Sequence, residues 1–186
     1  MILASLQVVL ANLFVTKQIV LFGLEVTPTD AYIIGSLLTV NVLQEYFGKE
    51  PAKKLLSINT YILIFFALMA CIQIFYTPSP HDFLHPAFNA VLSQSPRVFI
   101  GSIIAFYLSQ RLDIETFSFF RKKLTLPIAM FSSLAISQAC DTILFSYLAL
   151  YGVVHSIVSI MVLSYAIKLI TLFSMTPLTA FLKRSK

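Results

Sequence analysis

Six long apolar runs, separated by short polar connections, occupy most of this chain of 186 residues. A helix needs about 20 mostly apolar residues to cross the hydrocarbon core of a bilayer. Hydrophobic residues make up 58% of the sequence and charged residues 11%, whereas soluble domains carry roughly a quarter charged residues. One core could not hide so much apolar surface in a soluble protein of this size. The pattern predicts an all-α fold: a polytopic membrane protein whose six transmembrane helices form a single domain over residues 1–186.

The apolar runs define the predicted spans. The fourth run is the shortest, and a start near Phe88 is an alternative for it. The predicted spans cover residues 1–22, 27–47, 55–76, 97–112, 126–151 and 154–182.

Basic residues alternate between the connections. The connections 23–26, 77–96 and 151–155 contain no Lys or Arg. By the positive-inside rule, the basic connections and both termini are therefore expected to be cytoplasmic, in a multi-pass protein of the bacterial inner membrane. The net charge of +5 then reflects topology, and no nucleic acid partner is expected. The basic residues that set this orientation are Lys49, Lys53, Lys54, Arg111, Arg121, Lys122, Lys123, Lys183, Arg184 and Lys186.

The connection 77–96 is the one long external loop of this topology. Its four prolines, Pro78, Pro80, Pro86 and Pro96, argue against a regular helix. Two interpretations stay open: a lid over an external opening, or an ordered loop.

Charged residues inside the predicted spans are the strongest sign of function. Each costs roughly 2.5–3.5 kcal/mol to insert into the hydrocarbon, and such residues usually pair, face a cavity or serve transport. Lys17, Asp141 and Lys168 lie well inside their spans. At the depths that the topology assigns, they could meet in one polar chamber open to the outside. The alternative is an internal ion pair of Asp141 with one lysine that only holds helices together.

Amide and hydroxyl side chains share helical faces with these charges. Gln138 precedes Asp141 by three residues, a spacing that places both on one side of a helix. For any one of these polar residues alone, an interhelical hydrogen bond is favoured over solute contact. Glu45 could instead pair with Lys49 at a helix end. The primary candidates for solute binding are Asn12, Lys17, Glu45, Gln138, Asp141 and Lys168, and the polar faces add Asn41, Thr142 and Tyr165 as secondary candidates.

Enzyme and cofactor motifs are absent from the sequence. It contains no Gly-rich phosphate loop, zinc-protease motif, Cys/His metal cluster or nucleophile elbow. We therefore expect neither catalysis nor a resident cofactor or metal, and any transport is not driven by ATP hydrolysis in this chain.

Five stretches, in order along nearly the whole chain, resemble the queuosine-precursor transporter family, which is itself similar to the vitamin-uptake transporters. The resemblance adds Arg97, Tyr107 and Gln110 to the secondary candidates. Two departures, Asn41 and Met175 at positions where the family often has Asp, leave the exact solute open. The stretches are Ala11-Asn12 with Thr16-Lys17; 43–49 with Ala52; 94–97 continuing to Ser102, Tyr107, Ser109-Gln110 and Asp113; Ser137-Gln138 through Asp141-Thr142 to Phe145 and Tyr151-Gly152; and Tyr165, Lys168 and Thr176-Pro177.

The resemblance implies import of a 7-deazaguanine for tRNA modification: the cyano or aminomethyl precursor, queuine or queuosine. A guanine-like edge offers N–H donors, which Asp141 or Glu45 would accept. Its carbonyl and ring nitrogens would take donors from Asn12, Gln138 and either Lys17 or Lys168. An aromatic side chain could stack on the ring.

Three other functions stay open at this point. The chain could be the membrane substrate-binding subunit of an uptake system that uses an external ATPase module, a structural membrane protein with a polar core, or an intramembrane enzyme. Whether it forms a homo-oligomer is also open.

Overall fold

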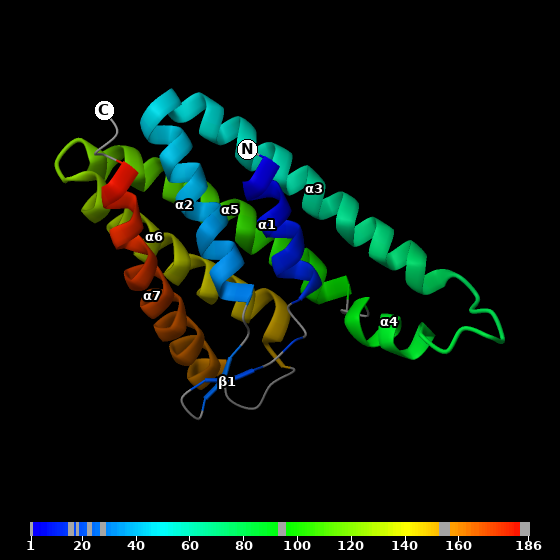
Figure 1. Ribbon diagram of the computed structural model, residues 1–186. Coiled ribbons are helices and arrows are strands. Elements are labelled where there is room, and N and C mark those ends of the chain that lie inside the picture. The colour runs from blue at the N-terminus through cyan, green and yellow to red at the C-terminus, as the bar shows by residue number, and fades with distance from the viewer. Residues whose placement is uncertain are drawn as a thin grey trace.

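The computed structural model describes residues 2–14, 17, 19–21, 24–26, 29–92, 96–152 and 157–182. In this part of the chain, long helices lie side by side in a bundle (Figure 1). The elements are α1 (Ile2–Leu13), β1 (Ile19–Leu21), β2 (Leu24–Val26), α2 (Thr29–Phe47), α3 (Lys49–Phe75), α4 (His85–Leu92), α5 (Pro96–Arg121), α6 (Leu126–Phe145), the π-helix η1 (Ser146–Leu150) and α7 (Ile157–Leu182).

The two ends of the bundle differ. The start of α1, the α2–α3 turn, the α5–α6 turn and the end of α7 lie together at one end (Figure 1). We call this the basic end, because Lys49, Arg121, Lys122 and Lys123 belong to its turns. The β1–β2 hairpin lies at the opposite end, the hairpin end.

The surface of the bundle is apolar, and its interior contains polar side chains among apolar core clusters. Phe75 of α3 is 91% exposed and Phe173 of α7 is 72% exposed. In water these side chains would form large unfavourable apolar patches. In a bilayer they contact lipid chains that are equally apolar. The distribution is typical of a protein embedded in a bilayer. Polar side chains that are nonetheless buried include Asn41, Asn59, Ser109, Gln110, Asp113, Ser133, Ser137 and Gln138.

Helix length supports a membrane location for part of the bundle. Among the described residues, Lys49–Phe75 and Leu126–Ala149 are each long and apolar enough to cross a membrane, and α4 with α5 qualifies as a bent third span. α1 and the apolar part of α7, Ile160–Thr176, are shorter. The all-helical membrane class is thus supported, while six spans stay a prediction.

The predicted first span, 1–22, is wrong beyond Leu13. There α1 ends, and residues 19–21 form a strand that pairs antiparallel with β2, with Ile19 opposite Val26. The β-branched Ile19 and Val20 favour an extended backbone, so an apolar run does not by itself specify a helix. Lys17 consequently lies outside α1.

The third and fourth spans are longer than predicted. Gly48 adopts φ of 87°, a conformation that costs glycine little, so one residue suffices for the turn and α3 begins at Lys49. Lys53 and Lys54 therefore belong to its first turns instead of a loop. α5 continues to Arg121, well beyond residue 112.

A helix does form within 77–96, which corrects the expectation drawn from the prolines. Pro86 is the second residue of α4 and Pro96 is the first of α5. The first N–H groups of a helix have no partner within it, so proline is tolerated there. The second and fifth predicted spans agree with α2 and with α6 plus η1. The sixth agrees with α7, except that residues 154–156 lie outside the described part.

Candidate functional site

A cavity of about 250 Å³ lies inside the bundle, toward the hairpin end. We call it the central cavity. Asn12, in the last turn of α1, and Thr29, the first residue of α2, place it there. Its other lining residues come from the interior faces of six helices: Val8, Ala11, Ile33, Leu37, Leu63, Ser102, Phe106, Ser109, Gln110, Gln138, Asp141, Phe145, Ser164 and Lys168.

Helical periodicity brings these residues to the same space. On α6, Gln138, Asp141 and Phe145 are separated by three and four residues and so share one face. Ser164 and Lys168 are four apart on α7. The corresponding stripe on α5 is Ser102, Phe106, Ser109 and Gln110.

A charge pair joins two walls of the central cavity. Lys168 Nζ lies 2.6 Å from Asp141 Oδ2, with the side chains 9% and 19% exposed. The ammonium also donates to Thr142 Oγ1 at 3.4 Å, and Ser109 Oγ donates to Asp141 Oδ1 at 3.4 Å. The internal ion pair considered from the sequence is therefore formed, and it faces a cavity instead of a closed helix contact.

Two amides of the central cavity have unused hydrogen-bonding groups. Gln110 is 1% exposed, and within the described chain neither its Nε2 nor its Oε1 has a partner. Gln138 is 2% exposed, and its Oε1 is likewise without a described partner. Leaving a buried polar group unpaired costs about 1–3 kcal/mol. Such groups are the natural contacts of a polar solute or water in the cavity.

Aromatic side chains complete the lining. Phe106 and Phe145 lie on α5 and α6, on the same faces as Gln110 and Asp141. The sequence could not distinguish these two from the remaining aromatic residues, because only packing shows which rings face inward.

Two primary candidates lie away from the central cavity. Lys17 is exposed beyond the end of α1 and does not join the chamber expected for it. Glu45 forms a two-point ion pair with Arg121, 2.8 Å from Nε to Oε2 and 2.8 Å from Nη2 to Oε1, at the basic end. The pairing of Glu45 with Lys49 that the sequence suggested is wrong, because Lys49 pairs with Glu115.

The secondary candidates separate in the same way. Gln110 lines the central cavity and Thr142 contacts Lys168, whereas Asn41 is buried one helical turn beyond the lining residue Leu37. The remaining three secondary candidates form hydrogen bonds within the protein that account for their polar groups. Arg97 donates to the carbonyls of Leu148 and Tyr151 at 2.9 and 2.8 Å, Tyr107 accepts from Arg111 at 3.2 Å, and Tyr165 donates to the Ala135 carbonyl at 3.1 Å.

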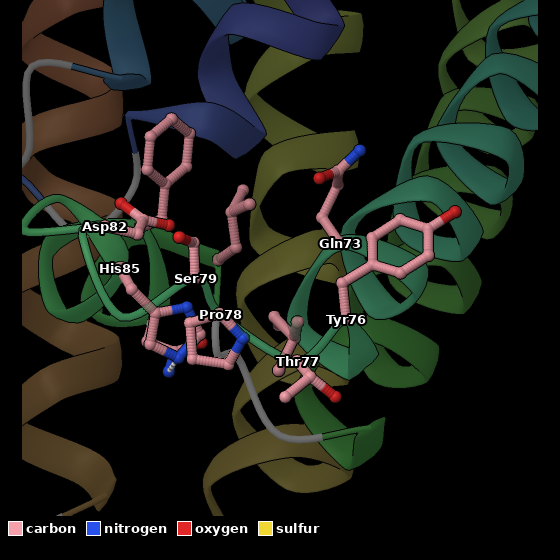
Figure 2. A pocket seen from close by; sticks show the side chains of 11 residues that line it. Gln73, Tyr76, Thr77, Pro78, Ser79, Asp82 and His85 are labelled. Atoms are coloured by element: carbon pink, nitrogen blue, oxygen red, sulfur yellow. Dashed lines mark hydrogen bonds between the residues drawn. The ribbon is translucent and has the colours of Figure 1, made fainter.

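A second cavity, of about 220 Å³, lies at the end of α3 (Figure 2). Gln73 comes from α3, Asp82 from the following loop, and His85 from the start of α4. Its polar groups serve local structure: Asp82 Oδ1 accepts from the Leu84 amide at 3.0 Å, and the His85 ring bonds Asn89 at 2.9 Å. The central cavity, with its buried charges and unused amides, is the stronger candidate.

Comparison with known proteins agrees with the resemblance drawn from the motifs. Residues 31–182 match the family described as "Putative vitamin uptake transporter". The chain is 29% identical over 176 residues to the "Probable queuosine precursor transporter" of Bacillus subtilis (strain 168), an alignment that covers 88% of this chain and 76% of that protein. No solved structure matches. Since the match extends over most of the helical bundle, this chain belongs to the vitamin uptake transporter family.

Proposed function

We propose that the chain imports a queuosine precursor, a 7-deazaguanine base, through the central cavity. The observation that carries this is the combination of a buried ion pair with unused amides and two aromatic rings in one space. Binding sites for small molecules typically join apolar walls with a few convergent polar groups. The relative from Bacillus subtilis, whose name specifies a queuosine precursor, supports the choice of solute.

The roles follow from hydrogen-bond chemistry. Asp141 accepts N–H donors from the guanine-like edge, as a carboxylate has only acceptors. Gln110 and Gln138 each offer both an amide donor and an acceptor, and Lys168 donates to the carbonyl side. Phe106 and Phe145 are in place to stack on the ring plane, a contact worth roughly 1–3 kcal/mol for bases.

The volume of the central cavity favours a base over a nucleoside. Drug-sized ligands occupy pockets of roughly 300–1,000 Å³, and this cavity has about 250 Å³. A fused two-ring base with a small substituent suits that space better than the same base carrying a ribose. We therefore rank the cyano and aminomethyl precursors above queuosine.

The proposal includes six spans in a bacterial inner membrane, with both termini cytoplasmic. Its support is that the turns with Lys49 and Arg121 share one end of the bundle with the start of α1 and the end of α7. Placing the basic end on the cytoplasmic side satisfies the positive-inside rule.

The test measures queuosine in tRNA from a bacterial strain that can neither make nor import the precursors. The strain expresses this chain and is fed each candidate 7-deazaguanine in turn. Wild type should restore queuosine with the small bases, and Asp141→Asn should not. Glu45→Gln is the matched control, because it makes the same change of carboxylate to amide outside the central cavity and should retain import.

Negative results are also informative. If properly inserted wild type restored nothing, copurification with ATPase subunits would show whether a coupling module is missing. If Asp141→Asn and Glu45→Gln lost import equally at normal protein levels, the central cavity would not be the solute site.

A further inference from the structure

A second buried carboxyl group lies one helical turn from the central cavity. Asp113 of α5 is fully buried, three residues after the lining residue Gln110, which corresponds to about 4.5 Å along the helix axis. By distance and angle, neither carboxylate oxygen forms a hydrogen bond in the described structure. Asn41 of α2 and Ser133 of α6 are nonetheless close enough to stabilise the carboxylate electrostatically. We call these three residues the Asp113 layer.

The surroundings of Asp113 are neutral. No described ion pair includes Asp113. Of the other charged groups described on the helices packed around it, Arg111 donates to the Tyr107 hydroxyl and Lys54 is exposed. An isolated buried carboxylate is costly, because removing an ion from water without a counter-charge is penalised by several kcal/mol. The charges satisfied elsewhere are Glu45 with Arg121, Lys49 with Glu115, Lys53 with Glu50, and Asp141 with Lys168.

Asn41 is suited to serve both protonation states of Asp113. Its Nδ2 lies 3.5 Å from Ser133 Oγ, while its Oδ1 is buried without a partner among the described residues. A protonated carboxyl group can donate to that free oxygen. A charged carboxylate can instead accept from the amide Nδ2 or from the Ser133 hydroxyl. A site of this kind is stable with and without one proton.

The Asp113 layer lies beside the central cavity. Leu37 of the lining precedes Asn41 by one helical turn, and Gln138 follows Ser133 on α6. Three helices therefore place the Asp113 layer next to the cavity, displaced toward the basic end. On α5, Gln110, with its unused amide, lies between Asp113 and Ser109, which donates to Asp141 at 3.4 Å.

We propose that the Asp113 layer is the binding site of a proton that is coupled to solute import. This proposal rests on the proposed function, and it identifies a proton gradient as the energy source for solute import. A proton entering through the central cavity forms an O–H bond with the Asp113 carboxylate and neutralises it. When the bundle opens toward the basic end, that bond breaks and the proton leaves with the solute. No oxidant or reductant is involved.

The first test uses purified full-length protein in liposomes and a radiolabelled aminomethyl 7-deazaguanine. Counterflow exchange measures solute binding and movement without a driving force, and accumulation under an imposed proton gradient measures coupling. Wild type should do both. Asp113→Asn, which keeps the shape but cannot titrate, should exchange at a rate within about twofold of wild type and lose at least about tenfold in accumulation, a loss of about 1.4 kcal/mol or more of driving force.

Glu115→Gln is the matched control. It lies two residues further along α5, where the Glu115 carboxylate is exposed and pairs with Lys49, and it should accumulate solute as wild type does. An arm with a sodium gradient and no proton gradient should give no accumulation.

An infrared titration provides a readout that needs no solute. Wild type should show the carbonyl band of a protonated carboxylic acid in a buried site, lost as the pH rises, and Asp113→Asn should lack this band. Proton-driven accumulation by Asp113→Asn, accumulation of solute by wild type on sodium alone, or an unchanged band in the variant would each overturn the proposal. Failure of wild type to exchange any 7-deazaguanine would instead refute the proposed function, and the coupling with it.

Discussion

Two of the described ion pairs that connect helices, Glu45 with Arg121 and Asp141 with Lys168, differ in what surrounds them. Glu45 and Arg121 join α2 to α5 at the basic end through two 2.8 Å contacts, and Arg121 also donates to the Leu124 carbonyl at 3.3 Å. Asp141 and Lys168 join α6 to α7 through one 2.6 Å contact beside a cavity with unpaired amides. Both oxygens of Glu45 are bonded to Arg121 in the first pair. The second pair lies beside amide groups that could still hydrogen-bond a solute.

We infer from the comparison that a charge within an apolar helix does not by itself identify the solute site. Both Glu45 and Asp141 satisfy that sequence criterion. Unused hydrogen-bonding capacity next to open volume distinguishes them, because a saturated pair can only hold helices together.

The largest effect is expected from Asp141→Ala. It should abolish uptake and lower the free energy of unfolding by about 3–5 kcal/mol, since it leaves the Lys168 charge buried and unpaired. Unfolding in detergent and uptake in cells measure the two effects. The double variant Asp141→Ala with Lys168→Ala should recover stability but not uptake. Recovered uptake in the double variant would show that the ion pair only stabilises the contact between α6 and α7.

Gln110→Leu should separate uptake from stability. We expect a loss of about tenfold or more in uptake, together with an unchanged or raised stability, because the substitution removes two unpaired buried polar atoms. Gln44→Leu is the matched control. The Gln44 amide donates to the Ile114 carbonyl at 2.8 Å and to Ser118 at 2.7 Å, so its loss should lower stability by about 1–3 kcal/mol. If Gln110→Leu destabilised the protein as much, the amide would have an undetected structural partner.

Glu45→Gln should lower stability without lowering uptake, whereas Asp141→Ala is expected to lower both. The unfolding free energy should fall by about 1–2 kcal/mol, since the pair with Arg121 is partly exposed and partly screened. Uptake per folded molecule, measured against membrane protein level, should stay near wild type. A large loss of uptake would move the functional site toward the basic end.

Lys17→Ala is expected to have the smallest effect. Lys17 is exposed and does not line the central cavity, and such surface substitutions change stability by no more than about 0.5 kcal/mol. Import in the queuosine assay should be unaffected. Loss of import in this variant would indicate that the hairpin end contacts the solute.

Most of the helical elements could be predicted from the sequence. Leu126 was correctly placed as the start of the fifth span, because a long apolar run followed a polar turn. The errors occurred where local chemistry overrides hydrophobicity. The β-branched residues 19–20 form a strand, one glycine replaces a loop at residue 48, and prolines at helix starts are tolerated.

The candidate site was only partly predictable. Asn12, Gln138, Asp141 and Lys168 all line the central cavity as expected, since helical spacing relates residues within one helix. Lys17 and Glu45 lie outside the central cavity. Lys17 follows the end of α1 at Leu13, and Glu45 pairs with Arg121 on another helix. In the sequence, Asp113 stands out only as part of a motif, and only the tertiary structure shows which side chains surround it.

The sequence by itself determined that this is an apolar helical protein of a transporter family, with charges in positions where lipid would not accept them unpaired. Those conclusions depend on composition, spacing and motifs, which are local. The tertiary structure alone decided that Asp141 pairs with Lys168, that Glu45 pairs with Arg121, and that Asp113 has no charged partner among the described residues. The reason is physical: the state of a buried charge is set by what other helices bring within a few ångströms of it, and sequence distance carries no information about that.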